Sequence, residues 1–204
     1  MNKIIAGVLA ILWTLLGFAV LSEAQTMKSE GLNARQKGII PIAAFTASGD
    51  MERLKTALNE GLDAGLTVNE IKEVLIQMYA YAGFPRSLNG IAAFMGVLEE
   101  RGKKGIKDEP GKEPNPLPAG KSSIELGTEI QTRLAGRPVT GPIYTFAPAI
   151  DQFLKGHLFG DIFGRDVLDF QSREIATISA LANMKGVNSQ LQSHFNIGLN
   201  VGLT

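Results

Sequence analysis

The sequence of 204 residues contains no cysteine, and this absence excludes several kinds of chemistry together. Without cysteine there is no disulfide framework, no thiolate nucleophile, no CxxC redox pair and no zinc–thiolate site. Only two histidines are present, His157 and His194, which is too few for a metal site built from a histidine cluster within one chain. We therefore expect acid–base, electrostatic or binding chemistry that uses no metal and no other cofactor.

An excess of charge of either sign is also missing. The 20 Lys and Arg residues balance the 20 Asp and Glu residues, so the formal net charge is zero. This balance gives no electrostatic reason to expect a partner among nucleic acids or anionic membranes. Hydrophobic residues make up 45% of the chain and charged residues 20%, which is typical of a globular protein. The length is sufficient for one domain, or two small ones, with a real hydrophobic core.

Residues 1–24 have the pattern of a secretory signal peptide. Lys3 gives a short basic start, and the eighteen positions that follow carry no charged residue. Ser22 and Ala24 are small residues placed before a cleavage point at Gln25. The alternative is an uncleaved membrane anchor, because eighteen apolar residues can just span a bilayer. We expect an exported protein, periplasmic or secreted, with no membrane association after cleavage.

After residue 30 the spacing of apolar residues is helical, and no stretch shows the sustained alternation of a β-strand. A capping box formed by Thr67 and Glu70 predicts the start of one helix. Pro41 predicts either a kink or a later start of the first helix. The fold class expected is all-α, with helices over residues 33–46, 51–64, 68–82, 85–102, 124–134, 149–163, 172–184 and 189–201.

The domain organisation is predicted from a linker and an internal repeat. Residues 103–122 contain four prolines among charged residues and glycines, a composition that is typical of a linker. The heptapeptide GLDAGLT at 61–67 recurs as GLNVGLT at 198–204, and with one inserted residue 32–67 aligns with 168–204. This similarity predicts a tandem duplication of a helical unit, with a first copy at residues 30–102 and a second at 123–204.

The second copy is predicted to be incomplete. Thr67 begins a helix in the first copy, whereas its counterpart Thr204 is the last residue of the sequence. We expect the counterpart of residues 68–102 to be missing through truncation of the chain. The alternative is a shortened second copy, which would leave the helix before Thr204 without its packing partner.

Several motifs, taken together, resemble the carboxymuconolactone decarboxylase family. In the second copy these are LFGDIFGR at 158–165, SREIATI at 172–178, QLQSH at 190–194 and GLNVGLT at 198–204. The first copy resembles a later segment of the same family, at 65–67, 70–71 and 81–89. The resemblance implies an all-α fold that assembles into homo-oligomers, either trimers or hexamers.

The family includes two chemistries, and this sequence can support one of them. The first is cofactor-free decarboxylation of a lactone from aromatic-acid breakdown. The second is the alkylhydroperoxidase D-like relay, which needs a CxxC pair. The two cysteine positions of that pair fall on Val187 and Gln190, so thiol peroxidase activity is excluded.

The resemblance also implies a set of site residues. His194 matches the active-site histidine of the family, Glu174 the glutamate one helix earlier, and Arg173 the arginine before that glutamate. Gln190 stands where the decarboxylases commonly have glutamate. We expect Gln190 and Asp161 to contribute to substrate binding, although Asp161 could instead cap the loop that follows it.

These residue types suit a decarboxylation. A guanidinium such as Arg173 binds a carboxylate through two hydrogen bonds, and an imidazole such as His194 can protonate the carbanion that remains. Glu174 would orient the imidazole or relay the proton. The simpler alternatives are that His194 is a structural or surface histidine and that Arg173 and Glu174 form a charge pair at a helix start.

The sequence thus predicts a cofactor-independent lyase that acts on a small carboxylated, lactone-type substrate. The alternative is a non-catalytic member that binds a small ligand with the same fold. Gln190 in place of an acid favours this alternative. So does the first copy, in which the histidine, glutamate and arginine positions are Ala57, Gly38 and Lys37.

Overall fold

The computed structural model describes residues 31–204, and within that range all regular secondary structure is helical. The all-α prediction is therefore confirmed for these residues. The predicted signal peptide, residues 1–24, lies outside the described residues and stays a prediction. Residues 32–204 form one compact unit. No helix within the described range is both long enough and apolar enough to cross a membrane.

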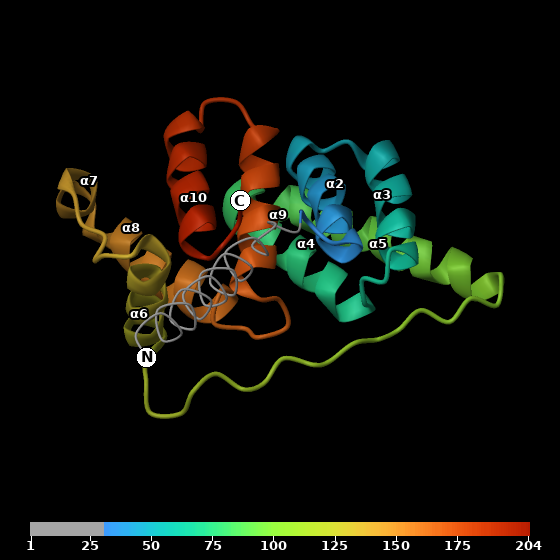
Figure 1. Ribbon diagram of the computed structural model, residues 1–204, viewed down its shortest axis with the longest axis horizontal. Helices are drawn as coiled ribbons and strands as arrows, with labels where there is room; N and C mark the ends of the chain where they lie inside the picture. Colours follow the sequence, from blue (N-terminus) through green and yellow to red (C-terminus); the bar gives the residue numbers. More distant parts are fainter. Residues whose placement is uncertain (1–30) are drawn as a thin grey trace, which may run out of the picture. The chain divides into compact units, whose positions relative to one another are not determined.

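The helices follow the predicted order closely (Figure 1). The predicted helix at 149–163 is in fact two elements, a short α-helix followed by a π-helix, and a further short helix precedes it. Residues 104–122 contain no helix. In chain order the elements are α2 (Ala34–Ser48), α3 (Met51–Asp63), α4 (Val68–Ala82), α5 (Phe84–Lys103), α6 (Ser123–Ala135), α7 (Pro142–Phe146), α8 (Pro148–Gln152), the π-helix η1 (Phe153–Ile162), α9 (Phe170–Ala182) and α10 (Asn188–Asn200).

Polar side chains cap the starts of α2, α3, α4, α6 and α9. The Thr67 hydroxyl accepts a hydrogen bond from the backbone N–H of Glu70 at 3.3 Å, and the Glu70 carboxylate accepts one from the backbone N–H of Thr67 at 2.8 Å. This capping box confirms the predicted start of α4. Pro41 lies inside α2, which begins at Ala34, so the later start is wrong.

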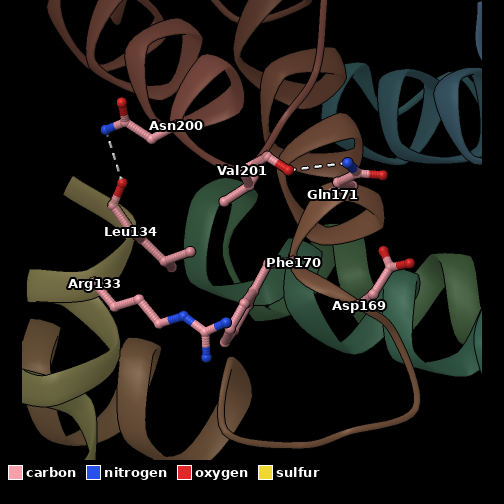
Figure 2. A pocket seen from close by; sticks show the side chains of 7 residues that line it. All are labelled: Arg133, Leu134, Asp169, Phe170, Gln171, Asn200 and Val201. Carbon is pink, nitrogen blue, oxygen red and sulfur yellow. Dashed lines mark hydrogen bonds between the residues drawn. The ribbon is translucent and has the colours of Figure 1, made fainter. Parts of the chain in front are cut away.

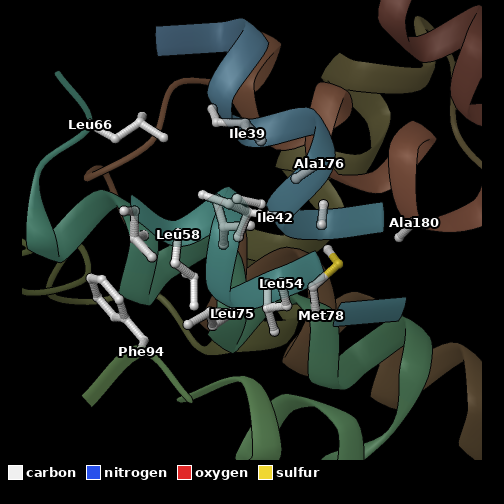
Figure 3. Packing of buried hydrophobic residues seen from close by; sticks show 14 of the residues in the cluster. Ile39, Ile42, Leu54, Leu58, Leu66, Leu75, Met78, Phe94, Ala176 and Ala180 are labelled. Carbon is white, nitrogen blue, oxygen red and sulfur yellow. The ribbon is translucent and has the colours of Figure 1, made fainter. Parts of the chain in front are cut away.

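The larger hydrophobic core lies among α2, α3, α4 and α5 and extends onto α9 (Figure 3). Ile42 of α2, Leu54 of α3 and Leu75 of α4 are fully buried there. Ala176 and Ala180 of α9 complete the cluster, and their small side chains allow α9 to pack closely against α2. The core therefore joins helices from both sides of the segment 104–122.

The second core joins α6 to η1 and α10, with Leu134, Phe159, Phe163 and Ile197 among its buried residues. Helices α6 and η1 pack backbone to backbone. A β-carbon on Gly127 of α6 would overlap the backbone carbonyl of Lys155, and one on Gly160 of η1 would overlap that of Ser123. Glycine is therefore required at both contact points.

A buried polar junction connects α4 to α9. The Glu73 carboxylate accepts hydrogen bonds from Arg165 at 2.7 Å and from Arg173 at 3.1 Å. The Gln77 amide accepts from Arg173 at 3.0 Å and donates to the Thr177 hydroxyl at 2.9 Å. Burial lowers the pKa of the Arg173 guanidinium, while the carboxylate of Glu73 acts in the opposite direction. The paired charges thus offset the cost of burial.

The irregular segment 104–122 connects α5 to α6 and is attached to the start of α4 and to the loop between η1 and α9. Backbone N–H groups in the first turn of α4 donate to the carbonyl groups of Glu109 and Pro110, at 2.9 and 3.0 Å. These bonds satisfy donors that a helix N-terminus leaves without an internal partner. Further along, Asn115 donates to the Asp166 carboxylate through its backbone and its side chain, which lowers the pKa of Asp166 to about 2.

Replacing Gly127 by alanine tests the backbone contact between α6 and η1. The new methyl group has no space against the carbonyl of Lys155, so we expect Gly127→Ala to lower the free energy of unfolding by about 3 kcal/mol in urea denaturation. Gly96→Ala in α5 is the matched control, because its β-carbon would meet no atom within 4 Å. That control should be neutral or stabilising by up to about 1 kcal/mol. Equal stability of the two variants would contradict the contact.

Replacing Glu73 by glutamine tests the junction between α4 and α9. The variant keeps the shape of the side chain but removes the charge that Arg173 needs in a buried position. We expect Glu73→Gln to lose about 3 to 5 kcal/mol of unfolding free energy. Glu99→Gln removes an exposed carboxylate that pairs with Lys103 on α5, and it should change stability by less than about 1 kcal/mol. A loss no larger than that of the control would show that the junction contributes little.

Candidate functional site

The structure brings His194 and Glu174 together. Glu174 lies in the second turn of α9 and His194 in the middle of α10, and the short loop between these helices sets them side by side. The ring atom Nδ1 of His194 lies 2.7 Å from Oε2 of Glu174, within hydrogen-bond distance. The side chain of Glu174 is fully buried and that of His194 is 10% exposed. The two residues form a buried histidine–carboxylate pair.

Tyr81, from the last turn of α4, completes this cluster. Its ring meets that of His194 edge to face, with 5.7 Å between the ring centroids. Burial, and then the nearby carboxylate of Glu174, raises the pKa of the Tyr81 hydroxyl above its ordinary value. The hydroxyl thus stays protonated at neutral pH and can act as a hydrogen-bond donor.

Two oxygen atoms of this cluster are buried without a hydrogen bond to the described part of the protein. Oη of Tyr81 and Oε1 of Glu174 are both buried, and neither has a hydrogen-bond partner within the described residues. Buried polar atoms of this kind are rare in folded proteins and are often found at functional sites. The pair of atoms gives the cluster one donor and one acceptor in addition to the ring of His194.

The sequence did not identify Tyr81 as a site residue. Tyr81 belongs to the predicted first copy, whereas Glu174 and His194 belong to the second. A tyrosine at this place in a helix is expected to belong to the core or to a pocket wall. Only the packing of α4 against α9 shows that its hydroxyl approaches the other two side chains.

Arg173 is adjacent to Glu174 in the sequence, but its hydrogen bonds go to residues outside this cluster. Its side chain is fully buried, and its guanidinium donates to Glu73, Gln77 and the backbone carbonyl of Arg165. Its guanidinium also lies over the ring of Phe163, with 5.6 Å to the centroid. These contacts support a positioning role for Arg173, because its terminal donors are used inside the protein.

Gln190 and Asp161 are separate from the histidine–carboxylate pair. Gln190 lies one turn before His194 on α10 but is exposed, and it accepts a hydrogen bond from the Ser189 hydroxyl at 2.9 Å. Asp161 of η1 accepts one from Ser123 of α6 at 2.6 Å and lies 2.9 Å from Nδ1 of His157. Among the described residues, no hydrogen bond or ion pair joins Gln190 or Asp161 to Glu174 or His194.

The Asp161 contacts also hold its carboxylate in the charged form. Burial opposes ionisation, but the hydrogen bonds from Ser123 and His157 outweigh it, so the pKa of Asp161 lies below its ordinary value. In the structure this carboxylate connects η1 to α6.

A cavity of about 350 Å³ opens between α6, α9 and the end of α10 (Figure 2). Two side-chain amides connect the walls of the cavity through hydrogen bonds to backbone carbonyl groups. Gln171 donates to the backbone carbonyl of Val201 at 2.9 Å, and Asn200 donates to that of Leu134 at 3.0 Å. No pattern in the sequence indicated this cavity. It is lined by Arg133, Leu134, Asp169, Phe170, Gln171, Asn200 and Val201.

Metal ligands do not gather in the part of the chain that the structure describes. Across residues 31–204, no group of three or more His, Asp or Glu side chains is placed to hold a metal ion. The chemistry available to the cluster of Tyr81, Glu174 and His194 is proton transfer and hydrogen bonding by these three side chains.

Comparison with known proteins agrees with the all-helical fold. The model of the Carboxymuconolactone decarboxylase family matches residues 10–95. The chain is also 30% identical over 78 residues to an uncharacterized 15.0 kDa protein in the nqo9–nqo10 intergenic region of Paracoccus denitrificans. That alignment covers 37% of this chain and 58% of the relative. The matched segment 10–95 includes Tyr81 but neither Glu174 nor His194, and over that segment the chain resembles the carboxymuconolactone decarboxylase family.

Proposed function

We propose that the protein is a carboxymuconolactone decarboxylase-like lyase that needs no cofactor and acts on a small carboxylated, lactone-type substrate. The observation that carries the proposal is the buried contact of 2.7 Å between His194 and Glu174. The family match at residues 10–95 supports the same class of protein.

The geometry gives each side chain of the cluster a role in proton transfer. Glu174 engages Nδ1 of His194, which fixes the orientation of the ring and leaves Nε2 to exchange a proton with a substrate. The surroundings are buried, so water competes little with these hydrogen bonds and the charges act strongly on a bound molecule. The site therefore suits a reaction in which a proton is added to or removed from carbon.

In the proposed reaction, the bond between the carboxylate carbon and the ring of the substrate breaks. Carbon dioxide leaves, and the electron pair of that bond remains on the substrate as a carbanion or enolate. Protonated His194 then delivers a proton to this carbon, and solvent reprotonates the ring afterwards. The Tyr81 hydroxyl, which stays protonated, donates a hydrogen bond to the developing enolate oxygen.

Arg173 serves this reaction through structure. By holding α9 against Glu73 and Gln77 of α4, it sets the distance between Glu174 and Tyr81. We retain Gln190 as a substrate-binding residue, because it lies on the exposed surface one turn from His194. Asp161 stays a weaker candidate for substrate binding, since its carboxylate is already engaged by Ser123 and His157.

A second candidate function is binding of a small ligand without catalysis. Two observations favour it. The guanidinium of Arg173 is used within the protein and does not offer a substrate its terminal donors. Gln190 also supplies no second acid next to His194.

We further propose that the chain arose by tandem duplication and that only the second copy carries the histidine and the glutamate of the site. The hairpins α2–α3 and α9–α10 correspond to the two aligned segments. In the first copy the histidine position is Ala57, which is buried in the larger core. The glutamate position is Gly38, where a β-carbon would lie 3.2 Å from Leu66. Packing thus fills the space that the site uses in the second copy.

Export and self-association complete the proposal. Export rests on the signal-peptide pattern of residues 1–24. Assembly into trimers or hexamers is supported by apolar side chains on α5, α7 and η1 that remain exposed in the single chain. These include Met95 at 67%, Ile143 at 64%, Phe146 at 92% and Phe153 at 67%. Apolar surface of this kind is typical of protein–protein contacts.

Replacing His194 by alanine tests the proposed chemistry. We expect His194→Ala to lower kcat/KM for carbon dioxide release from a carboxylated lactone by about 10²- to 10⁴-fold, because the proton donor is lost. Helicity, followed by circular dichroism, should stay unchanged. His157→Ala is the matched control, because it removes the other histidine. His157 lies on η1, where it pairs with Asp161 of the same helix.

Full turnover by His194→Ala would contradict the assignment of the site. A wild-type protein that binds such lactones, as shown by thermal stabilisation, but releases no carbon dioxide would support the second candidate function.

A further inference from the structure

A substrate with a carboxylate needs a cation to bind it, and Arg173 is poorly placed for that task. The residues around the cavity between α6, α9 and α10 offer another guanidinium. Arg133, in the last turn of α6, lies over the ring of Phe170 with 5.3 Å to the ring centroid. Stacking of this kind restricts the guanidinium to one orientation while its N–H groups stay available at the edge.

Arg133 has no other partner in the described part of the chain. Between residues 31 and 204, its side chain makes no hydrogen bond and no ion pair. It is the single cationic side chain among the residues that line the cavity. Arg133 is exposed, and a guanidinium that lies over an aromatic ring with its edge open can bind a carboxylate through two parallel hydrogen bonds.

The rest of the lining suits a small planar molecule. Leu134, Phe170 and Val201 supply apolar walls, and Figure 2 shows Leu134 and Phe170 facing the same space. Gln171 and Asn200 use their amide N–H groups to hold backbone carbonyls, which leaves their amide oxygens as acceptors. The cavity volume of about 350 Å³ falls within the range of small-molecule sites.

Asp169 is the acidic residue of the lining, and its carboxylate is engaged at the start of a helix. Its carboxylate accepts the backbone N–H of Ser172 at 2.7 Å and caps the start of α9. In Figure 2 the ring of Phe170 lies between Asp169 and Arg133. No ion pair joins the two charged groups within the described residues. The guanidinium of Arg133 is therefore available to an external anion.

The cavity lies on the same helix faces as the histidine–carboxylate pair. Phe170 precedes Glu174 by four residues on α9, which is about one turn of the same face. On α10 and its C-terminal cap, His194, Ile197 and Val201 follow one another at spacings of three and four residues, so they also share a face. The cavity is thus at the end of the strip between α9 and α10 on which Glu174 and His194 lie.

We propose that this cavity binds the carboxylate of a small planar organic acid through Arg133, with the body of the molecule against Leu134, Phe170 and Val201. The part that concerns catalysis rests on the proposed function. It requires the bound acid to extend from this cavity along the strip between α9 and α10 toward Glu174 and His194, which are not among the residues that line the cavity. Arg133 then takes the carboxylate-binding role that the sequence suggested for Arg173.

Calorimetric titration of the purified protein with benzoate and with benzamide tests the binding site. The two probes have the same shape and differ in charge. We expect benzoate to bind at least about tenfold more tightly than benzamide, because only the carboxylate pairs with Arg133. Arg133→Gln should remove this preference. Arg137→Gln, which deletes an exposed charge in the loop after α6 without touching the cavity, should preserve it.

Each result decides the proposal in one direction. Equal binding of the two probes, or an unchanged preference in Arg133→Gln, would overturn it. A preference that only the Arg133 variant loses would support it. Arg133→Lys separates charge from geometry, because lysine keeps the charge and loses the planar pair of donors. A weaker preference for benzoate in this variant supports a bidentate contact. A full preference for benzoate would overturn the bidentate contact.

Failure of the site and failure of the proposed function give different results. In a carbon dioxide release assay, Arg133→Gln should raise KM for the lactone by about tenfold or more and leave kcat nearly unchanged, which a loss of folding would not do. His194→Ala should still bind benzoate like the wild type. If the wild-type protein binds benzoate through Arg133 but releases no carbon dioxide, the binding site stands and the lyase function is rejected.

Discussion

The buried carboxylate of Glu73 is the contact on which the candidate site depends. It pairs with Arg165 and Arg173, and through them it holds α4 against α9. Tyr81 and Glu174 lie on these two helices, so the distance between them is set by this junction. Buried charges are favourable only while they remain paired, so the junction favours one relative position of α4 and α9. The site is therefore assembled by an ion pair that takes no part in its chemistry.

The two hydrophobic cores hold different pairs of helices together. The larger core fixes α2 to α9 through Ala176 and Ala180, and the second core fixes α6 to η1 through Gly127 and Gly160. Both cores reach the hairpin α9–α10, one from each side. The facing sides of α9 and α10 can therefore carry the cluster near the middle of the hairpin and line the cavity at one end of it. Rigid support of this kind is what the proposed proton transfer would require.

Sequence patterns anticipated most of the helices because each has its own local signal. The capping box of Thr67 and Glu70 and the spacing of apolar residues require no knowledge of distant contacts. Glu174 and His194 were named from motifs, and the structure places them in contact, while their role in a reaction stays a prediction. Tyr81, the partners of Arg173 and the stacking of Arg133 on Phe170 all arise from contacts between segments far apart in the chain, which periodicity does not encode. The π-helix η1 likewise carries no pattern that separates it from an α-helix.

The attachment of residues 104–122 affects how the parts on either side of it meet. This segment is held by backbone hydrogen bonds at the start of α4 and by the contact of Asn115 with Asp166. A linker keeps two packing surfaces at a high effective concentration. A linker that is itself bound to the fold allows these surfaces fewer relative arrangements than a free linker. Proteolytic nicking within the segment would turn the pairing of α4 with α9 into an association that depends on protein concentration. Dilution alone would then separate Tyr81 from His194.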